Sequence, residues 1–177
     1  MPIRITGGSF RGRSVSSPQG EGTRPTAALV REALFNILQD VSGYAVLDLY
    51  AGTGIVGMEA VSRGAAIVYA VEMRNAQARL IQKAYESLDV SDKLRMITKN
   101  AMSLCENPSP VKNGFDLIYA DPPFTEAYPD LRGFFKWLKP GGYAVFEVPS
   151  RVVPEWAPAE AVRRYGESSL AFFRAPA

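Results

Sequence analysis

The sequence predicts an α/β fold in which a mostly parallel sheet is covered by helices on both faces. Two observations support this fold. Short apolar runs alternate with helical segments from residue 44 onward, and the runs at 45–49 and 115–120 are apolar at nearly every position. Strands that are apolar on both faces are typical of parallel sheets buried between helices. A hydrophobic content of 47% in 177 residues suits one domain with a complete core.

The N-terminal part is expected to be a small separate unit. Residues 2–16 alternate between apolar and polar side chains around glycines, a pattern that favours a two-stranded ribbon. Residues 16–25 are rich in Ser, Pro and Gly and predict a loop. We therefore divide the chain into a basic β-ribbon with its loop, residues 1–25, and one globular domain, residues 26–177.

The globular domain is expected to begin with a helix near Thr26, because apolar residues from Leu29 to Leu38 recur at three-and-four spacing. Strands and helices then alternate. The strands are expected at 45–49, 67–71, 94–97, 115–120 and 143–148, the helices at 55–63, 74–88 and 130–138, and a turn at 140–142. Two further strands, near 162–166 and 169–174, are expected to close a seven-stranded sheet as an antiparallel hairpin.

Composition excludes several kinds of active site. The chain has no histidine, which removes the usual general base, the commonest metal ligand and the Ser-His-Asp triad. Its single cysteine, Cys105, cannot form an intrachain disulfide, and we interpret it as a buried apolar residue. No apolar run reaches the length of a membrane span, and the first residues lack a signal-peptide pattern. We expect a cytoplasmic protein with no membrane segment and no metal ion, in which carboxylates, Lys, Tyr or backbone groups serve any acid–base chemistry.

Positive charge is concentrated near the N-terminus. Residues 1–31 contain five arginines and one acidic residue, whereas the remainder contains 15 basic and 17 acidic residues. A basic segment on a near-neutral body indicates a polyanionic partner. The alternative is a solvated, arginine-rich hairpin without a partner. The arginines in question are Arg4, Arg11, Arg13, Arg24 and Arg31.

Polar residues stand at the ends of four predicted strands. Asp48 opens a glycine-containing loop after the first strand, and Glu72 follows the second. Asn100 follows the third strand and Asp121 the fourth. Sheets of this kind bind ligands beyond the carboxyl ends of their strands, where the strand order reverses. We therefore expect these four residues to line one edge of the sheet as a binding site.

The first of these strand ends is a candidate cofactor site. Its loop contains Asp48, Tyr50, Gly52 and Gly54, and glycines allow the backbone to approach a ligand closely. With Gly57, the two glycines also fit the G-x-G-x-x-G spacing of dinucleotide-binding proteins. A carboxylate at Asp48 would repel a pyrophosphate but suits the cationic amino acid part of S-adenosylmethionine. We therefore predict S-adenosylmethionine as the cofactor.

Two further strand ends complete the predicted cofactor site. An acid at Glu72 can accept hydrogen bonds from two ribose hydroxyls, a role that NAD would use equally. Asn100, together with Ala101, can reach the adenine edge. The alternative for Asn100 is the N-cap of a short helix at 101–104.

The fourth strand end carries the unusual run Asp121, Pro122, Pro123 and Phe124. Proline donates no backbone hydrogen bond, and two in a row leave their carbonyls free to accept one elsewhere. The Asp121 carboxylate and the Pro122 carbonyl can accept both hydrogens of an exocyclic amino group on a nucleobase, while Phe124 stacks on the base. The alternative is a structural turn in which Asp121 caps the next helix. We predict these four residues as the catalytic group of an amino-directed methyltransferase.

The motifs resemble a known family over nearly the whole chain: the bacterial 16S ribosomal RNA guanine-N2 methyltransferases of the small-subunit type. The N-terminal motifs are specific, whereas Asp-Pro-Pro-Phe alone fits many adenine-N6 methyltransferases equally well. The motifs that carry the resemblance are RITGG at 4–8, RGR at 11–13, TRPT at 23–26, REALFNIL at 31–38, DLYAGTG at 48–54, SRGA at 62–65 and DPPF at 121–124.

The resemblance implies a class I methyltransferase fold, S-adenosylmethionine as methyl donor, and one guanine in 16S rRNA within a partly assembled 30S particle as substrate. It also implies that Arg4, Arg11 and Arg13 meet RNA phosphates, which position an enzyme without reading sequence. Arg24 and Arg31 flank the junction between loop and helix and are expected to reach the target nucleotide or its phosphate. Nothing in the sequence indicates more than a monomer.

Three alternatives remain open at this point. An adenine-N6 DNA or RNA methyltransferase would use the same catalytic run. An NAD-linked oxidoreductase would use the glycine loop, although the chain has no histidine for a hydride-transfer site. A non-catalytic RNA-binding factor would keep the fold without the chemistry.

Overall fold

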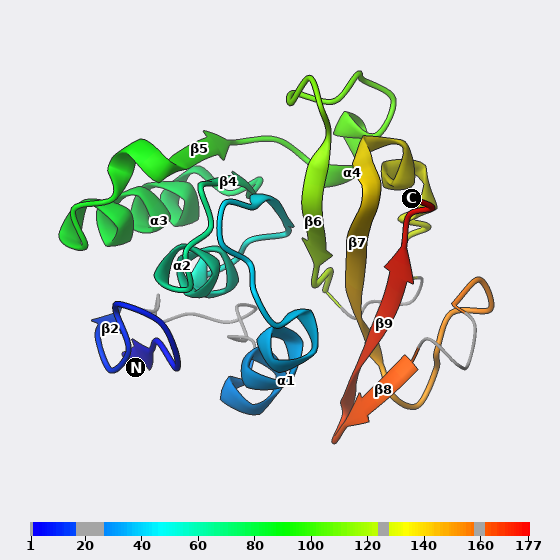
Figure 1. Ribbon diagram of the computed structural model, residues 1–177, viewed down its shortest axis with the longest axis horizontal. Coiled ribbons are helices and arrows are strands. Elements are labelled where there is room, and N and C mark those ends of the chain that lie inside the picture. The colour runs from blue at the N-terminus through cyan, green and yellow to red at the C-terminus, as the bar shows by residue number, and fades with distance from the viewer. Residues whose placement is uncertain (1, 17–26, 124–127, 158–161) are drawn as a thin grey trace.

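The described part of the chain forms a seven-stranded sheet and a separate two-stranded ribbon (Figure 1). The structure, a computed structural model, describes residues 2–16, 27–123, 128–157 and 162–177. In the ribbon, β1 (Ile3–Arg4) pairs antiparallel with β2 (Ser14–Val15). The predicted N-terminal ribbon is therefore confirmed. The expected helix start at Thr26 and the boundary between ribbon and domain lie outside the described residues.

The central sheet has the strand order β5-β4-β3-β6-β7-β9-β8. Strands β3 to β7 run parallel, and β9 pairs antiparallel with both β7 and β8. The chain moves outward from β3 to β5 and then returns to β6 on the other side of β3, so the strand order reverses between β3 and β6. This confirms the predicted sheet with its antiparallel C-terminal hairpin. The strands are β3 (Ala45–Leu49), β4 (Ile67–Val71), β5 (Leu94–Ile97), β6 (Phe115–Ala120), β7 (Leu138–Pro149), β8 (Val162–Tyr165) and β9 (Ser168–Arg174).

Helices cover both faces of the sheet. Three of them, α1 to α3, pack on one face together with the N-terminal ribbon, and α4 and η2 pack on the other (Figure 1). In α3, Ala78, Ile81 and Tyr85 are buried at three-and-four spacing, which fixes the side that meets the sheet. In the described ranges, no helix is both long and apolar enough to cross a membrane. The helices are α1 (Ala28–Leu38), α2 (Ile55–Ser62), α3 (Asn75–Ser87), η1 (Ser91–Lys93), α4 (Ala101–Leu104) and η2 (Arg132–Trp137).

The segment at 130–138 differs from the prediction, because it forms a 3-10 helix, η2, instead of an α-helix. Leu131, Phe134 and Trp137 are all buried and stand three residues apart. A 3-10 helix has three residues per turn, so this spacing places all three side chains on one side. The rings of Phe134 and Trp137 meet edge to face with centroids 5.1 Å apart.

The turn expected at 140–142 is instead an irregularity inside the long strand β7. The β6 partner of Leu138 is Phe115, but the partner of Tyr143 is Leu117, so β7 contains extra residues at this point. Gly141 adopts φ +73°, which glycine allows without a steric penalty. An unpaired insertion of this kind bends a strand without ending it.

The turn of the N-terminal ribbon is hydrogen-bonded to the last residue of α2. The Ser62 carbonyl accepts the Ser9 N–H at 2.7 Å, and the Ser62 hydroxyl donates to the Gly7 carbonyl and accepts the Phe10 N–H. Gly8 adopts φ +77°, and a Cβ at this position would lie 1.9 Å from the Ser62 carbonyl oxygen. Only glycine fits here. Because α2 begins after β3 and runs back along the sheet, these contacts lie at the edge where the parallel strands begin.

Candidate active site

The carboxyl ends of β3 to β6 meet at one edge of the sheet, here called the strand-end rim (residues 48–54, 72–74, 100–101 and 121–123). The strand registers determine which residues lie side by side. Leu49 pairs with Val71 on one side and with Ala120 on the other. The glycine loop after β3 is therefore flanked by the segment at Glu72 and by the segment at Asp121. The four polar strand ends seen in the sequence come together at this rim.

The glycine loop turns sharply between β3 and α2. Gly52 and Gly54 adopt φ +56° and +73°, and Gly54 is the N-cap residue of α2. A Cβ at Gly54 would lie 3.0 Å from the side chain of Ile81, so the close approach of α3 also favours glycine. Tyr50 adopts φ +59°, a strained backbone for a large side chain, and such strain is common at ligand sites. Burial raises the pKa of the Tyr50 hydroxyl, so this ring stays neutral.

Asp48 lies beneath the glycine loop and is only 2% exposed. One of its carboxylate oxygens accepts the Gly57 N–H at 3.2 Å. Burial raises the pKa of Asp48 to about 7, the Gly57 hydrogen bond opposes this, and the charge of Glu72 adds to it. A cation placed beside such a poorly solvated carboxylate stabilises its ionised form more than it would stabilise an exposed carboxylate.

The hydroxyl of Tyr85 lies next to this carboxylate. Tyr85 is fully buried, and its hydroxyl has no hydrogen-bond partner among the residues described. The charge of Asp48 contributes to a raised pKa of Tyr85, after the larger effect of burial. A Cβ at Gly57 would lie 2.8 Å from the Tyr85 oxygen, so Gly57 makes room for this ring. Apart from its place in the apolar spacing of α3, nothing in the sequence marks Tyr85.

Glu72 is held at the rim by backbone and side-chain donors. It is 6% exposed, and one oxygen accepts the Gly52 N–H at 3.2 Å. The other oxygen accepts the Arg74 N–H at 2.9 Å and forms a 3.2 Å ion pair with the Arg74 guanidinium. The carboxylate thus lies directly against the glycine loop, where the predicted ribose contact would be made.

Asn100 caps the short helix α4, as the structural alternative predicted. Its side-chain oxygen accepts the Met102 N–H at 2.9 Å. The side chain is exposed at the end of β5, and Ala101 behind it is buried. The cap fixes the position of Asn100 at the rim, and its contact with a cofactor stays a prediction.

The run after β6 lies across the rim from the glycine loop. Asp121 is half-buried, Pro122 is buried and Pro123 is exposed. Phe124 lies outside the described residues, so its predicted stacking role has no structural description. Among the described residues, no group of three acidic or cysteine side chains could hold a metal ion.

Tyr128 and Glu147, which the sequence interpretation missed, lie beside Asp121. The Tyr128 hydroxyl donates a hydrogen bond to the Glu147 carbonyl at 2.7 Å, and Tyr119 donates to the Glu147 carboxylate at 2.8 Å. Burial raises the pKa of Tyr128, and the charges of Asp121 and Glu147 raise it further. Tyr128 therefore stays a neutral hydroxyl next to the predicted catalytic run. The sequence offered one signal for Glu147, because it is an acidic residue inside the apolar strand predicted at 143–148.

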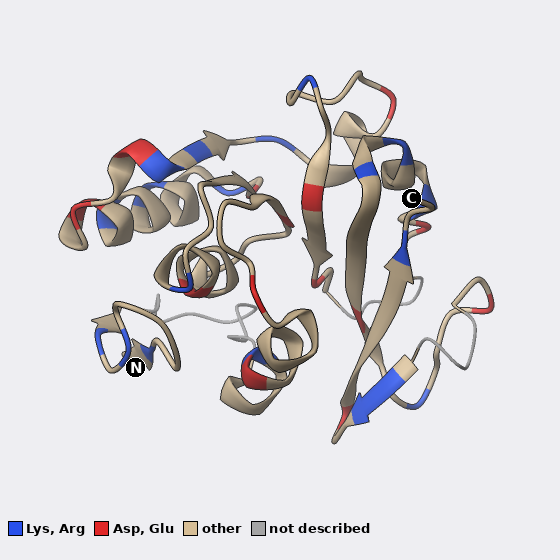
Figure 2. Ribbon diagram, in the orientation of Figure 1, with Lys and Arg blue, Asp and Glu red and all other residues tan. Residues whose placement is uncertain are grey.

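The predicted RNA-binding arginines divide into two groups. Arg4, Arg11 and Arg13 are exposed on the ribbon, whose basic residues are visible in Figure 2. Arg31 is a correction, because it is only 2% exposed, donates to the Arg4 carbonyl at 2.7 Å and lies 3.6 Å from the Glu59 carboxylate. Its guanidinium is held inside the protein by these two partners, which leaves it little access to an RNA phosphate. Arg24 lies outside the described residues.

A comparison with protein families identifies the group to which this chain belongs. The family model described as conserved hypothetical protein 95 matches residues 3–174. The chain belongs to this family. It is also 40% identical over 123 residues to the ribosomal RNA small subunit methyltransferase D of Escherichia coli. That match covers 69% of this chain and 60% of the relative, so it spans less than two thirds of the relative's length.

Solved structures agree with the fold of this family member. A putative methyltransferase of Escherichia coli, yhhF, matches with a TM-score of 0.81 and 29% identity over 100% of this chain and 99% of that chain. An RNA methyltransferase from Salinibacter ruber in complex with S-adenosyl-L-homocysteine matches with a TM-score of 0.66 over 86% of this chain and 94% of the other. At 18% identity, this second likeness concerns the fold. The expected class I methyltransferase fold is confirmed.

Proposed function

We propose that this protein is an S-adenosylmethionine-dependent methyltransferase that modifies the exocyclic N2 amino group of one guanine in 16S rRNA. The observation that carries the proposal is the proximity of two groups at the strand-end rim. The glycine loop and Asp121 follow neighbouring strands, because Leu49 pairs with Ala120. A donor held by the loop would therefore lie beside an amino group held by Asp121. The similarity to a small-subunit rRNA methyltransferase supports 16S rRNA as the substrate.

The residues of the rim fit S-adenosylmethionine better than a dinucleotide. Asp48 is a buried carboxylate that would repel a pyrophosphate and would be stabilised by an ammonium group. Glu72 would accept hydrogen bonds from the ribose hydroxyls, Asn100 and Ala101 would meet the adenine edge, and Tyr50 would contribute from the glycine loop itself. When bound, S-adenosylmethionine supplies an electrophilic methyl group on a sulfonium. The protein's own contribution is then mainly orientation and exclusion of water.

Asp121 and the Pro122 carbonyl would hold the amino group. The amino nitrogen of guanine is a weak nucleophile because its lone pair is delocalised into the ring. Two acceptors on its hydrogens favour a pyramidal nitrogen whose lone pair is aimed at the donor. Charge-assisted hydrogen bonds to a carboxylate are about twice as strong as neutral ones. Asp121 need not be a strong base, because the amino proton becomes acidic once the methyl group is attached.

The N-terminal ribbon would bind the RNA backbone. Arg4, Arg11 and Arg13 are exposed and would neutralise phosphates near the target. A base in a single-stranded loop is the expected target, since duplex RNA hides its base edges. We further propose that the enzyme acts as a monomer in the cytoplasm, on a partly assembled 30S particle.

Mass spectrometry of 16S rRNA tests this function. A strain that lacks the gene should lose one methyl group from one guanine, and the purified protein should restore it from labelled S-adenosylmethionine. Naked 16S rRNA and 30S particles from the deletion strain would be compared as substrates. Label on the N6 atom of adenine would instead support the adenine-N6 alternative. The proposal would be contradicted if no RNA were labelled and the methylation pattern of 16S rRNA were unchanged in the deletion strain.

A further inference from the structure

The turn of the N-terminal ribbon is far from the site of chemistry. It is hydrogen-bonded to Ser62, the last residue of α2, while α2 begins at the glycine loop. A helix of eight residues is about 12 Å long. An RNA strand that meets Arg11 or Arg13 on this turn must therefore cross at least this distance to deliver a base to Asp121.

Helix α3 spans this interval beside α2. It begins just after Glu72 at the strand-end rim, and its 13 residues extend for about 20 Å toward the opposite edge. Its buried side, with Ile81 and Tyr85, faces the core. Its outer side carries the exposed cations Arg79 and Lys83.

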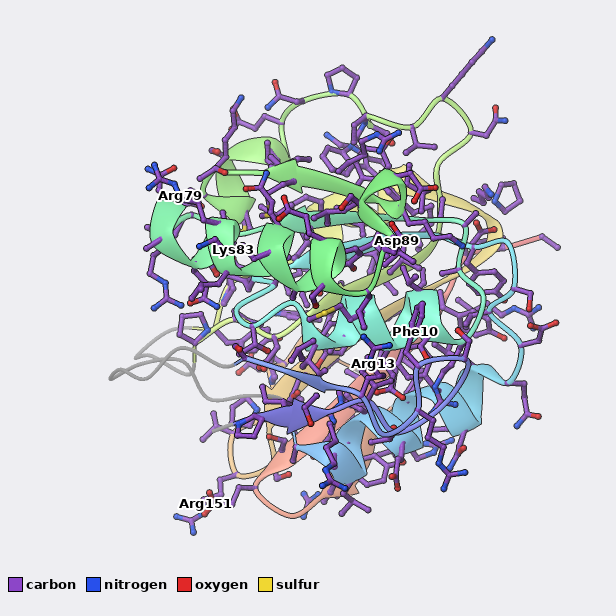
Figure 3. The ribbon with its side chains drawn as sticks, turned by 90° about the vertical axis from the view of Figure 1, so that its left-hand side faces the viewer. Phe10, Arg13, Arg79, Lys83, Asp89 and Arg151 are labelled. Carbon is purple, nitrogen blue, oxygen red and sulfur yellow. The ribbon has the colours of Figure 1, made fainter. Side chains whose placement is uncertain are left out.

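These two cations continue a row that ends at the ribbon. Arg79, Lys83 and Ser87 are four residues apart, so they lie in line on one side of α3, separated by about 6 Å along its axis. Ser87 itself carries no charge, but its carbonyl accepts a hydrogen bond from the guanidinium of Arg13 at 3.3 Å, so a positive charge lies at this position too. Arg79, Lys83 and Arg13, here called the α3 row, thus form a line of three positive charges (Figure 3).

The local charge balance favours an anionic partner. Residues 2–16 contain three arginines and no acidic residue, and α3 contains two cations and one acid, Glu86. A second carboxylate, Asp89, lies just beyond the helix end (Figure 3). Neither Arg79 nor Lys83 forms a salt bridge within the part of the chain that the structure describes. Two long cations that form no salt bridge with any described residue, in line with a third, are suited to the repeating charge of a phosphate backbone.

We propose that the α3 row binds the phosphate backbone of the RNA strand whose base enters the strand-end rim. The row connects the rim with the ribbon turn, so the strand would be held along the whole path from the ribbon turn to the reacting nucleotide. Contacts of this kind fix position and carry no sequence information. This inference rests on the proposed function, because it takes RNA as the substrate.

The salt dependence of binding tests the row. The variant pair Arg79→Ala with Lys83→Ala removes two cations from α3, and the control pair Lys112→Ala with Lys136→Ala removes two exposed cations elsewhere. Binding of naked 16S rRNA and of 30S particles from a deletion strain would be measured across a range of salt concentrations. The slope of log K against log salt is negative. For contacts to a single strand, each lost phosphate partner reduces its magnitude by about 0.7. The α3 pair should therefore lower it by about 1.4, with the affinity for S-adenosylmethionine unchanged.

The control separates a local contact from a general charge effect. The α3 proposal stands if the Arg79 and Lys83 pair changes the slope and the Lys112 and Lys136 pair does not. It is overturned if both pairs change the slope equally, or if the α3 pair changes nothing. The wild-type product tests the function independently. Methylation of guanine N2 with an unchanged slope would contradict only the proposed role of the α3 row. A changed slope with methyl transfer to adenine would support that role and contradict the guanine assignment.

Discussion

The carboxylate of Glu59 and the guanidinium of Arg31 meet in the protein interior, 3.6 Å apart, with both side chains at most 2% exposed. Glu59 also accepts the backbone N–H and the hydroxyl of Thr6, at 2.9 and 2.7 Å, and pairs with Arg63 at 3.1 Å. Arg31 donates to the carbonyl of Arg4. One buried carboxylate thus joins α1, α2 and the N-terminal ribbon.

We expect Glu59→Gln to lower the free energy of unfolding by about 3 kcal/mol. Removing one partner of a buried ion pair leaves the other charge uncompensated, which typically costs about 3–5 kcal/mol. Urea unfolding checks this, with the exposed Glu86→Gln as a control that should change stability by less than about 0.5 kcal/mol. A loss below about 1 kcal/mol for Glu59→Gln would mean that other contacts of Arg31, such as its hydrogen bond to the Arg4 carbonyl, stabilise its charge without Glu59.

Tyr85→Phe is expected to leave the protein as stable as the wild type or slightly more stable. The Tyr85 hydroxyl is fully buried and has no hydrogen-bond partner among the described residues. An unsatisfied buried hydroxyl costs about 1–3 kcal/mol, and the substitution removes it without changing the ring. Thermal unfolding of the two proteins under the same conditions measures the difference. A clear fall in the melting temperature would indicate that the hydroxyl has a partner, such as an ordered water at Asp48.

Cofactor affinity should depend on pH through Asp48. Its pKa is about 7 without a bound cation, and an ammonium beside it would lower that pKa. Binding therefore favours the ionised form and releases a proton below pH 7. The dissociation constant should rise roughly tenfold for each pH unit below 7 and should be constant above pH 7. Calorimetry between pH 5.5 and 7.5, in two buffers of different ionisation enthalpy, measures both the affinity and the proton release. Asp48→Asn should bind less tightly and lose this dependence, whereas a flat profile in the wild type would contradict the prediction.

Asp121→Ala should remove most turnover and leave cofactor binding nearly intact. The carboxylate follows β6 and would contact the amino group of the substrate, while the proposed cofactor residues follow β3, β4 and β5. Single-turnover methylation and calorimetry on the same preparation separate the two effects. The control is Asp92→Ala, which removes an exposed charge in η1. If Asp121→Ala keeps more than about a tenth of the wild-type rate, Asp121 is not the main acceptor.

The four parallel strands that form the rim were predictable to the residue. Each of β3, β4 and β6 is a short apolar run bounded by turn residues, and local hydrophobicity is a sufficient signal for strands inside a sheet. The edge strand β5 is interrupted by the exposed Arg95 but is still apolar at its other three positions. The polar residues at their ends followed from the same pattern. Their meeting at one edge then depended only on the strands being parallel.

The features that were missed depend on contacts between distant parts of the chain. Arg31 carries the same charge as the ribbon arginines, and only its burial against Glu59 separates it from them. The irregularity in β7 is visible only in its pairing with Phe115 and Leu117 of β6, and Trp137 of η2 packs against the same Phe115 ring. Tyr128 reaches the rim because its hydroxyl bonds to Glu147, 19 residues away.

The contacts between the ribbon turn and Ser62 leave the N-terminal ribbon little freedom to swing, since Gly8 has no space for even a methyl group. An RNA that touches both ribbon and rim would find a surface of fixed curvature. The RNA would then have to change its shape on binding, and its stiffness determines the free-energy cost of that deformation. Strands that bend easily would be favoured over stiff ones, including at positions that the protein never touches.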